Sequence, residues 1–199
     1  MIAGLLLAAG ESTRMGSPKP LLDWGGQPLV CYQVRQLQRA GCDLVVVVLG
    51  SRAERVAPFV EPLGVKVVLN PDYAQGRASS VRAAAGAIPP TPEWVLVLGV
   101  DQPRPATVIR LIIVAAKASP GSIVMPVYRK RFGHPTAFSG RLLGEMRAVD
   151  DATLGLRAVV RRHETEMELA EIDAAVVRLD LNTPEDYRRA RADRNLWRR

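Results

Sequence analysis

Two glycines and two basic side chains lie close together near the N-terminus, in the stretch AAGESTRMGSPK (residues 8–19). Ala8, Ala9 and Gly10 are small enough to let the backbone come close to a flat ligand. Gly16 permits a tight turn whose N–H groups stay exposed. Because successive exposed N–H groups form a concave site for anions, the stretch is a candidate anion-binding loop.

The charges of this loop suit a triphosphate. The guanidinium of Arg14 can donate two parallel hydrogen bonds to phosphate oxygens, while the ammonium of Lys19 acts as a point charge. Pro18 keeps Ser17 out of the helical region, so we expect an extended chain between the two charges. The loop is not a P-loop, because five residues separate its glycines, and it contains no G-x-G-x-x-G pattern. The alternative is a simple connector after a strand.

A single aspartate follows the apolar run VLVLGV (95–100). Such a run predicts a buried strand, and Asp101 would then lie at its carboxyl end, on the same edge of the sheet as the first loop. A carboxylate there could hold Mg²⁺ together with water and phosphate oxygens. The alternative is that Asp101 caps a helix that begins near Pro103 or Pro105.

The remaining polar candidates are weaker. Ser79 and Ser80 follow a glycine at the start of a predicted helix, where they could contact a base or ribose or could simply cap the helix. His134 lies between glycine and proline, and a lone histidine is more often structural than functional. His163, in RRHETE, belongs to no motif and is expected at the surface.

Apolar runs alternate with helix-like segments through the first half of the chain. This alternation, with valine-rich runs that do not alternate in polarity, predicts a parallel sheet covered by helices on both faces. In the second half the pattern becomes irregular and predicts a mixed sheet. We therefore expect an α/β fold, a single-domain Rossmann-like three-layer sandwich with a mostly parallel, partly mixed sheet. Expected strands are 2–8, 43–50, 65–69, 94–100, 122–128, 134–139 and 174–181, and expected helices are 29–41, 51–60, one from about 77, 106–118, 140–147, 153–163 and one from 183.

Composition excludes several classes of protein. The 199 residues suit one domain. The apolar run near the N-terminus is too short to span a bilayer, and it makes a poor signal peptide because no basic residue precedes it, so we expect a cytoplasmic protein that has no membrane partner. The net charge is +7, but the basic residues are scattered and only 5% of residues are aromatic, which argues against nucleic acid. The C-terminal YRRARADRNLWRR is expected to form a helix with Tyr187 and Trp197 packing inward. Cys31 and Cys42 are expected to be free.

Several motifs together resemble those of the molybdopterin nucleotidyltransferase family. They are LLLAAGESTRMGSPKPLL, NPDYAQGRASSVRAA, VLGVDQP, GHP and LDLNTPEDY, and they occur in the family's order over nearly the whole chain. The resemblance implies an Mg²⁺-dependent transfer of a nucleoside monophosphate from an NTP to the terminal phosphate of a pterin-type acceptor, with release of pyrophosphate. It also implies a molybdoenzyme or its chaperone as a further partner.

The resemblance assigns roles to particular residues. Arg14, Lys19 and Asp101 would be catalytic, and Asp101 and Asn182 would hold the metal. His134 would face the acceptor. Residues 1–105 would form the NTP-binding half and 106–199 the acceptor-binding half. The nucleotide contacts would come from Leu7, Ala8, Ala9, Gly10, Gly16, Asn70, Ser79 and Ser80.

The identity of the two substrates stays open at this stage. The resemblance favours CTP over GTP, because the loop reads LAAG where guanylyltransferases usually read LAGG. Asn182, however, resembles the guanylyltransferases, and AVDDATLGLRAVV (148–160) departs from the usual cytidylyltransferase pattern. Another phosphorylated acceptor, such as a sugar phosphate or phospholactate, is one alternative. A nucleotide- or cofactor-binding chaperone without turnover is the other.

Overall fold

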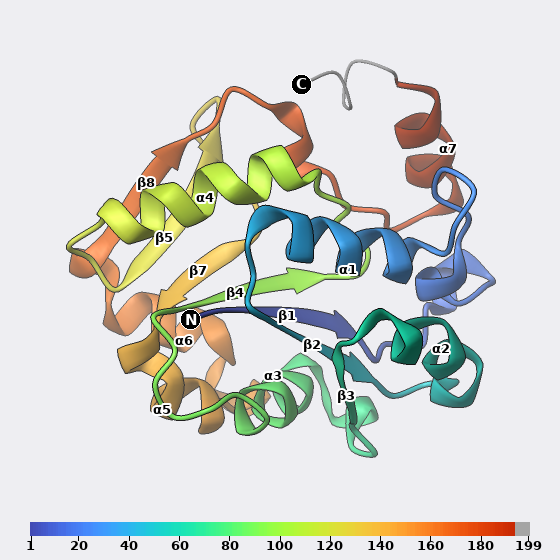
Figure 1. The fold of residues 1–199 in the computed structure, drawn as a ribbon, viewed down its shortest axis with the longest axis horizontal. Helices are drawn as coiled ribbons and strands as arrows, with labels where there is room; N and C mark the ends of the chain where they lie inside the picture. Colours follow the sequence, from blue (N-terminus) through green and yellow to red (C-terminus); the bar gives the residue numbers. More distant parts are fainter. Residues whose placement is uncertain (194–199) are drawn as a thin grey trace.

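An eight-stranded sheet runs through the middle of the molecule (Figure 1) in the computed structural model, which describes residues 1–193. The strand order is β3-β2-β1-β4-β7-β5-β6, and β8 pairs with β5. The first four strands are parallel, β7 is antiparallel to β4 and to β5, and β8 is parallel to β5. The expectation of a mostly parallel, partly mixed sheet is confirmed. The strands are β1 Ile2–Ala8, β2 Leu44–Leu49, β3 Lys66–Leu69, β4 Trp94–Gly99, β5 Ile123–Tyr128, β6 Arg131–Phe132, β7 Thr136–Ser139 and β8 Met167–Glu171.

Helices cover both faces of this sheet, so the three-layer sandwich is also confirmed (Figure 1). One face carries α1, α2, α4 and α7, and the other carries α3, α5 and α6. The helices are α1 Leu29–Ala40, α2 Ala53–Val60, α3 Arg77–Gly86, α4 Ala106–Ala118, α5 Leu143–Arg147, α6 Leu156–Arg162 and α7 Pro184–Ala192.

The central strand β1 shows why both layers are needed. All seven of its residues are buried. Successive side chains of a strand point to opposite faces, so Ile2 and Leu6 pack into the core beneath α1 and α4, while Leu5 and Leu7 pack into the core beneath α3. A strand that is apolar at every position must be covered on both sides, because each exposed apolar face would cost free energy in water.

The order in which strands are added to the sheet reverses at β1. From β1 the chain proceeds through β2 to β3 on one side, and then returns to place β4 on the other side of β1. The loops that leave the carboxyl ends of β1 and β4 therefore diverge and leave a crevice between them, which is where ligands bind in open α/β sheets. The candidate loop 8–19 and Asp101 follow these two strands.

The C-terminal part differs from the expectation in two places. The expected strand 174–181 is wrong: Ala175–Arg178 form a turn of 3-10 helix, whose Val176 and Val177 are buried in the core. The edge strand is instead β8, which the sequence analysis missed. Its sequence MELAE has exposed and half-buried positions only, so it lacks the apolar run by which the inner strands were recognised.

The short strand β6 lies between two expected strands, where no strand was expected. It forms a hairpin with β5, and the tip of this hairpin has positive φ at Arg129 and Lys130. The hydroxyl of Tyr187 in α7 donates to the carbonyl of Asp23, whereas Trp197 lies outside the described residues. Both cysteines are free and buried, and burial raises the pKa of Cys42 to about 12. No helix within residues 1–193 is long and apolar enough to cross a membrane.

Candidate active site

A cavity of about 340 Å³ lies at the crevice between β1 and β4. We call it the nucleotide cavity, after the ligand that the loop chemistry predicts. Its walls come from the carboxyl ends of the two strands, from the loop after β1 and from the start of α3. The lining residues are Leu7, Ala9, Gly10, Ser12, Thr13, Arg14, Lys19, Tyr73, Gly76, Arg77, Ser80, Gly99, Val100 and Asp101.

The loop after β1 is shaped by two left-handed residues. Ser12 has φ 59° and Gly16 has φ 68°, and the short 3-10 turn Thr13–Met15 lies between them. The hydroxyl oxygen of Ser12 accepts a hydrogen bond from the backbone N–H of Lys19 at 2.9 Å, which closes the loop on itself. The chain bends at Gly16 and Ser17, so the expectation of an extended chain between Arg14 and Lys19 is wrong. A Cβ atom at Gly10 would meet no protein atom within 4 Å, so the space beside it is open to a ligand.

Three predicted residues from distant parts of the sequence meet at the edge of this cavity, which Lys19 and Asp101 line and Asn182 does not. The ammonium Nζ of Lys19 lies 2.8 Å from the carboxylate Oδ2 of Asp101 and 3.3 Å from the amide Oδ1 of Asn182. The Lys19 side chain is only 13% exposed. A lysine after β1 is thus held between a carboxylate after β4 and an amide from the segment before α7.

Backbone contacts hold Asp101 in this position. A Cβ atom at Gly99 would lie 2.5 Å from Oδ1 of Asp101, so only glycine at the end of β4 leaves room for the carboxylate. The N–H of Leu181 donates to the carbonyl of Asp101 at 2.8 Å and brings Asn182 alongside. Because α4 begins at Ala106 and its N-cap is Pro105, Asp101 does not cap that helix.

The donor set fits a hard divalent cation. Asp101 and Asn182 present two oxygen atoms that already converge on one positive charge, and Mg²⁺ and Mn²⁺ both accept carboxylate and amide oxygens. Within residues 1–193 there is no cluster of three or more histidine, cysteine, aspartate or glutamate side chains that could hold a metal. A metal ion here would therefore complete its coordination with water and with oxygens of a bound phosphate.

Several predicted nucleotide contacts lie behind the cavity wall. Asn70 is buried, and its amide Nδ2 donates to the hydroxyl oxygens of Ser79 and Ser80 at 2.9 and 3.0 Å. Ser80 lines the cavity, whereas Ser79 donates to backbone carbonyls of the preceding turn. The side chain of Ala8 packs into the core instead. The hydrogen bonds from Asn70 to Ser79 and Ser80 fix the start of α3 against the end of β3.

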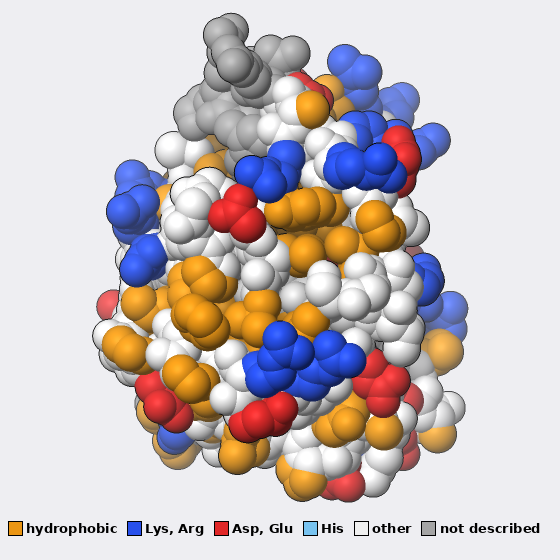
Figure 2. Space-filling view, turned by 90° about the vertical axis from the view of Figure 1, so that its right-hand side faces the viewer, with side chains coloured by type: hydrophobic (Ala, Val, Ile, Leu, Met, Phe, Trp, Pro, Cys, Tyr) orange, Lys and Arg blue, Asp and Glu red, His pale blue; other side chains and the backbone are white. Residues whose placement is uncertain are grey.

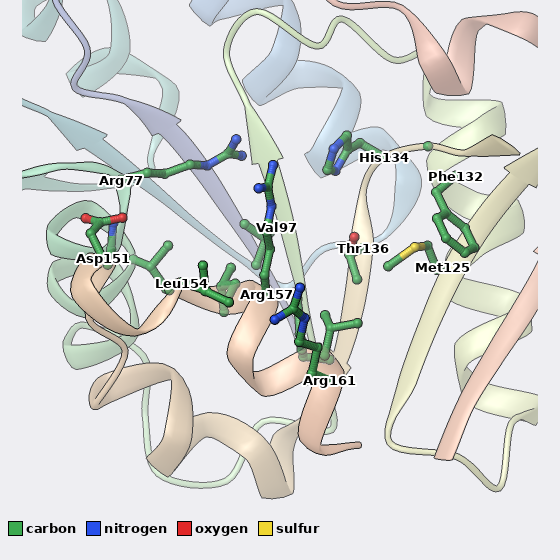
Figure 3. A pocket seen from close by; sticks show the side chains of 17 residues that line it. Arg77, Val97, Met125, Phe132, His134, Thr136, Asp151, Leu154, Arg157 and Arg161 are labelled. Atoms are coloured by element: carbon green, nitrogen blue, oxygen red, sulfur yellow. The ribbon is translucent and has the colours of Figure 1, made fainter. Parts of the chain in front are cut away.

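A second and larger cavity, of about 770 Å³, adjoins the first (Figure 3). We call it the acceptor cavity. Its walls come from α3, β4, β5, the segment 132–138 and the segment 151–161. The lining residues are Arg77, Ala78, Val81, Val97, Met125, Phe132, Gly133, His134, Thr136, Phe138, Asp151, Leu154, Gly155, Leu156, Arg157, Val160 and Arg161.

His134 lines the acceptor cavity and is neutral there. Burial, followed by the positive charges of Arg104 and Arg77, lowers its pKa to about 4. Its Nδ1 atom is buried and has no hydrogen-bond partner within the described part of the chain. A neutral imidazole with a free nitrogen can donate to or accept from a bound molecule.

Arg77 lines both cavities, and the sequence analysis did not single it out. It is the first residue of α3, after Gly76 with φ 127°. Oδ2 of Asp151 accepts from the N–H of Ala78 at 2.8 Å and approaches Gly76 so closely that a Cβ atom there would lie 2.2 Å away. A basic residue directly after a glycine at a helix start was the signal that could have found it.

A buried arginine connects the two cavities, and the sequence analysis did not single it out. Arg104 is fully buried, and its guanidinium donates to the backbone carbonyls of Pro103, His134, Val177 and Leu179 at 2.8 to 2.9 Å. Burial lowers its pKa to about 9, which still leaves it charged near neutrality. It therefore connects the loop after β4 with the segment that carries His134.

Two glutamines complete this support. The amide of Gln33, in α1, donates to the carbonyl of Gln102, and its Oε1 accepts from the N–H of Arg104. Oε1 of Gln102 accepts from the N–H of Gly99 at 2.8 Å, and its amide donates to Asp180 at 3.0 Å. These bonds fix the turn that presents Asp101.

Figure 2 shows the side of the molecule on the right of Figure 1, where hydrophobic side chains are exposed between groups of Lys and Arg.

Comparisons with known proteins agree with this geometry. The family model described as "MobA-like NTP transferase domain" matches residues 4–167. The chain is 30% identical to "Nicotine blue oxidoreductase" of Paenarthrobacter nicotinovorans, over 94% of this chain and 95% of the relative. It is 28% identical to "Molybdenum cofactor cytidylyltransferase" of Escherichia coli (strain K12), over 92% of each.

Solved structures show the same fold. The crystal structure of Rv0371c from Mycobacterium tuberculosis H37Rv superposes with a TM-score of 0.83 at 29% identity, and the match covers 96% of this chain and 98% of that one. A complex of Rv0371c with manganese superposes with a TM-score of 0.77 and covers 94% and 96% of the two chains, also at 29% identity. The single-domain α/β fold is thus shared along almost the full length.

Proposed function

The chain belongs to the family of MobA-like NTP transferase domains, and from this premise we propose that it transfers a nucleoside monophosphate from CTP to the terminal phosphate of a pterin-type acceptor such as molybdopterin. That it is a nucleotidyltransferase follows from the family match and from the cytidylyltransferase relative. Pyrophosphate would be the second product. The observation that carries the proposal is the meeting of Lys19, Asp101 and Asn182 at the nucleotide cavity.

The proposed chemistry needs little from the protein except position and charge. The attacking group is a phosphate, which is already an anion, so no general base and no protein nucleophile is required. Arg14 and Lys19 would stabilise the negative charge that increases on the α-phosphate and on the leaving pyrophosphate. To do this, Lys19 would exchange its contact with Asp101 for contacts with phosphate oxygens.

Mg²⁺ is the proposed cofactor, held by Asp101 and Asn182. When bound there it would neutralise phosphate charge and orient the reacting groups. The manganese complex of Rv0371c supports a divalent ion in this fold, and the two converging oxygens support its position in this chain. The side chain of Asp101 would be the charged protein ligand, and that of Asn182 a neutral one.

The division of roles between the cavities belongs to the same proposal. The NTP would occupy the nucleotide cavity, whose lining residues all precede position 102. The acceptor would occupy the acceptor cavity, with His134 facing it, and a molybdoenzyme or its chaperone would receive the product. The boundary at residue 105 is not strict, because Arg77 and Val97 also line the acceptor cavity.

Pyrophosphate release tests the proposal. Each of the four NTPs is combined with Mg²⁺ or Mn²⁺ and with a panel of acceptors that includes molybdopterin, sugar phosphates and phospholactate. We expect release with CTP and molybdopterin. Release with another acceptor would identify a nucleotidyltransferase of different specificity, and nucleotide binding without any release would support a non-catalytic chaperone.

The name of one relative requires a parallel measurement. Because a protein 30% identical to this chain is named an oxidoreductase, oxidation of reduced nicotinamide dinucleotides is followed in the same panel. A quinone dye is added as the two-electron acceptor, and its reduction by the dinucleotide without pyrophosphate release would contradict the transferase proposal. The carboxylate, amide and ammonium at the nucleotide cavity favour phosphate chemistry, and we therefore expect no oxidation.

A further inference from the structure

One face of the sheet forms the floor of the acceptor cavity. Val97 of β4 and Thr136 of β7 are paired across the two strands, and both line the cavity. Thr136 and Phe138 are two residues apart in β7 and so point to the same side of the sheet. Phe138 and His134 line the cavity as well. The floor therefore carries aromatic and polar side chains next to one another.

Apolar side chains continue this floor toward β5 and β8. Phe132 of β6 lies directly across from Val127 of β5, so it shares a face of the sheet with Met125, two residues along β5. Leu169 of β8 is in register with Met125. Met125 and Phe132 also line the cavity. We call Met125, Phe132 and Leu169 the apolar shelf.

The apolar shelf is largely open to solvent. Phe132 is 60% exposed and Leu169 is 51% exposed. Leu154, which lines the cavity from the segment before α6, is 48% exposed. Single exposed apolar residues are ordinary, but a group of them beside a cavity is typical of a binding surface. A ligand that covers the shelf removes this apolar area from water.

Two neutral polar groups lie beside the shelf. Figure 3 shows Phe132 and Met125 together on one side of His134 and Thr136. Within residues 1–193 the hydroxyl of Thr136 makes no hydrogen bond, and neither does the neutral imidazole of His134. Among the lining residues, His134 and Thr136 carry the neutral polar side chains. Both groups can donate to a ligand or accept from it.

This combination suits the face and the edge of a flat ring. The face of an aromatic ring can cover the shelf, where it contacts another aromatic ring and a thioether, and both contacts are favourable. The edge of the ring can carry nitrogen or oxygen atoms that reach the two polar groups. A sugar fits poorly, because its hydroxyls would lose water over the shelf without gaining a partner.

We propose that the acceptor carries a flat heteroaromatic ring whose face lies on Phe132 and Met125. The polar edge of this ring contacts Thr136 and His134. Phe132 and Thr136 thereby determine the specificity for the acceptor. The proposal rests on the proposed function in one respect: the reacting phosphate of the acceptor points toward Arg77, which lines both cavities. Sugar phosphates and phospholactate are then excluded, since neither has a flat apolar face.

Three phosphate monoesters test the proposal by calorimetry, in the absence of NTP and metal. The probes are 2-naphthyl phosphate, pterin-6-ylmethyl phosphate and glucose 6-phosphate, which share one phosphate and differ in the body attached to it. We expect 2-naphthyl phosphate to bind about tenfold more tightly than glucose 6-phosphate, the effect of removing roughly 55 Å² of apolar surface from water. The pterin phosphate should bind at least as tightly as 2-naphthyl phosphate, because its edge adds hydrogen bonds.

Variants of Phe132 show whether the shelf causes this preference. In Phe132→Ala the preference for 2-naphthyl phosphate should disappear, while binding of glucose 6-phosphate stays within about twofold of the wild type. Phe132→Tyr keeps the ring and should keep the preference. The matched control is Phe59→Ala, because Phe59 of α2 is 47% exposed and lines neither cavity. It should bind all probes as the wild type does.

Thr136→Val tests the polar edge separately. This variant removes the hydroxyl and retains a branched side chain in β7, so it should weaken binding of the pterin phosphate by about threefold or more and leave 2-naphthyl phosphate unaffected. Unchanged binding of the pterin phosphate would contradict the contact with the edge. Weaker binding of the pterin phosphate than of 2-naphthyl phosphate by the wild type would contradict it too.

Four results would overturn the inference as a whole: equal or tighter binding of glucose 6-phosphate by the wild type, no binding of any probe, a preference that survives in Phe132→Ala, or the same loss in Phe59→Ala. Circular dichroism and the thermal shift with CTP establish that the variants are folded and that the nucleotide cavity is intact. Failure of the proposed function would appear separately, as absence of pyrophosphate release, because the probe measurements involve no turnover.

Discussion

The two cavities share Arg77 but are constructed differently. The nucleotide cavity is formed largely by the ends of two adjacent parallel strands and by one short loop, Gly10–Lys19, whose shape depends on its own hydrogen bonds and on two left-handed residues. The acceptor cavity is formed by five separate segments and is lined by apolar side chains and by three arginines. The shape of the first therefore depends more on local sequence, and that of the second on tertiary packing. Variation in the second can change the acceptor without disturbing the first.

The largest effect is expected from Arg104, because it connects the two cavities. Replacing it by methionine removes four hydrogen bonds to buried carbonyls, so we expect the free energy of unfolding to fall by about 3–5 kcal/mol. Urea denaturation measures this. Arg110→Met is the control, since Arg110 donates to one exposed carbonyl, and a loss under about 1 kcal/mol in both variants would show that the cavities are held together by other contacts.

Lys19→Ala should affect the nucleotide cavity alone. We expect turnover to fall by about 10² or more, the effect of removing one fixed donor to developing charge. The measurement is pyrophosphate release, and circular dichroism should show an unchanged fold. Lys66→Ala is the control, because Lys66 contacts only the exposed carbonyl of Ala87. Wild-type turnover in Lys19→Ala would contradict the phosphate role of this lysine.

Base preference should also reside in the nucleotide cavity. CTP with Mg²⁺ should raise the melting temperature more than ATP or UTP, by about 5 °C or more at a concentration near 100 Kd, since a ligand that binds only the folded state stabilises it by mass action. The shift should be the same in Phe132→Ala. If GTP gives the largest shift, the guanylyltransferase interpretation suggested by Asn182 replaces the cytidylyl one.

The two histidines should respond to acid in opposite ways. Burial lowers the pKa of His134 to about 4. Below about pH 6.5 the unfolded chain therefore binds a proton at this histidine, whereas the folded chain binds it only below about pH 4. Stability should therefore fall as the pH drops through this window. Arg104, Arg77, Asp180 and Asp101 are the charged groups that act on His134. His134→Asn should flatten the dependence of the melting temperature on pH, and an unchanged slope would argue against a buried neutral imidazole.

A smaller and opposite effect is expected at His163, which is outside both cavities. Its nitrogens lie 2.9 Å from Glu166 and 2.7 Å from Glu145, and these hydrogen bonds raise its pKa. The stability that it contributes is thus complete below its unfolded pKa of about 6.5 and is lost as the pH rises through its folded value. Arg162 and Arg141 pair with the same two carboxylates. His163→Asn should lower the melting temperature at pH 6 and have less effect at pH 9.

Sequence alone was sufficient for what is local. The position of loop 8–19 after β1, the valine-rich strands and the start of the last helix near residue 183 each depend on a few consecutive residues, and the structure has them where they were expected. The aspartate after β4 was also found, because the carboxyl ends of neighbouring parallel strands share one edge of the sheet.

Features that depend on tertiary contacts were not found. Strand β8 has no apolar run, and its place is set by pairing with β5. Arg104 resembles any surface arginine in the sequence, and only the convergence of distant carbonyls explains its burial. Likewise, the presence of Arg157 and Arg161 in the lining of the acceptor cavity depends on which side of α6 faces it.

An Mg²⁺ titration of pyrophosphate release tests the central claim most directly, namely that Asp101 and Asn182 form the metal site of a nucleotidyltransferase. Wild type, Asp101→Asn and Asn182→Asp are compared with the acceptor found in the panel, and circular dichroism confirms folding. The account predicts no activity for Asp101→Asn at ordinary Mg²⁺ concentration. It also predicts full or higher activity at a lower Mg²⁺ midpoint for Asn182→Asp, because a second carboxylate binds the ion more strongly. A folded Asp101→Asn that stays active with an unchanged midpoint would contradict it.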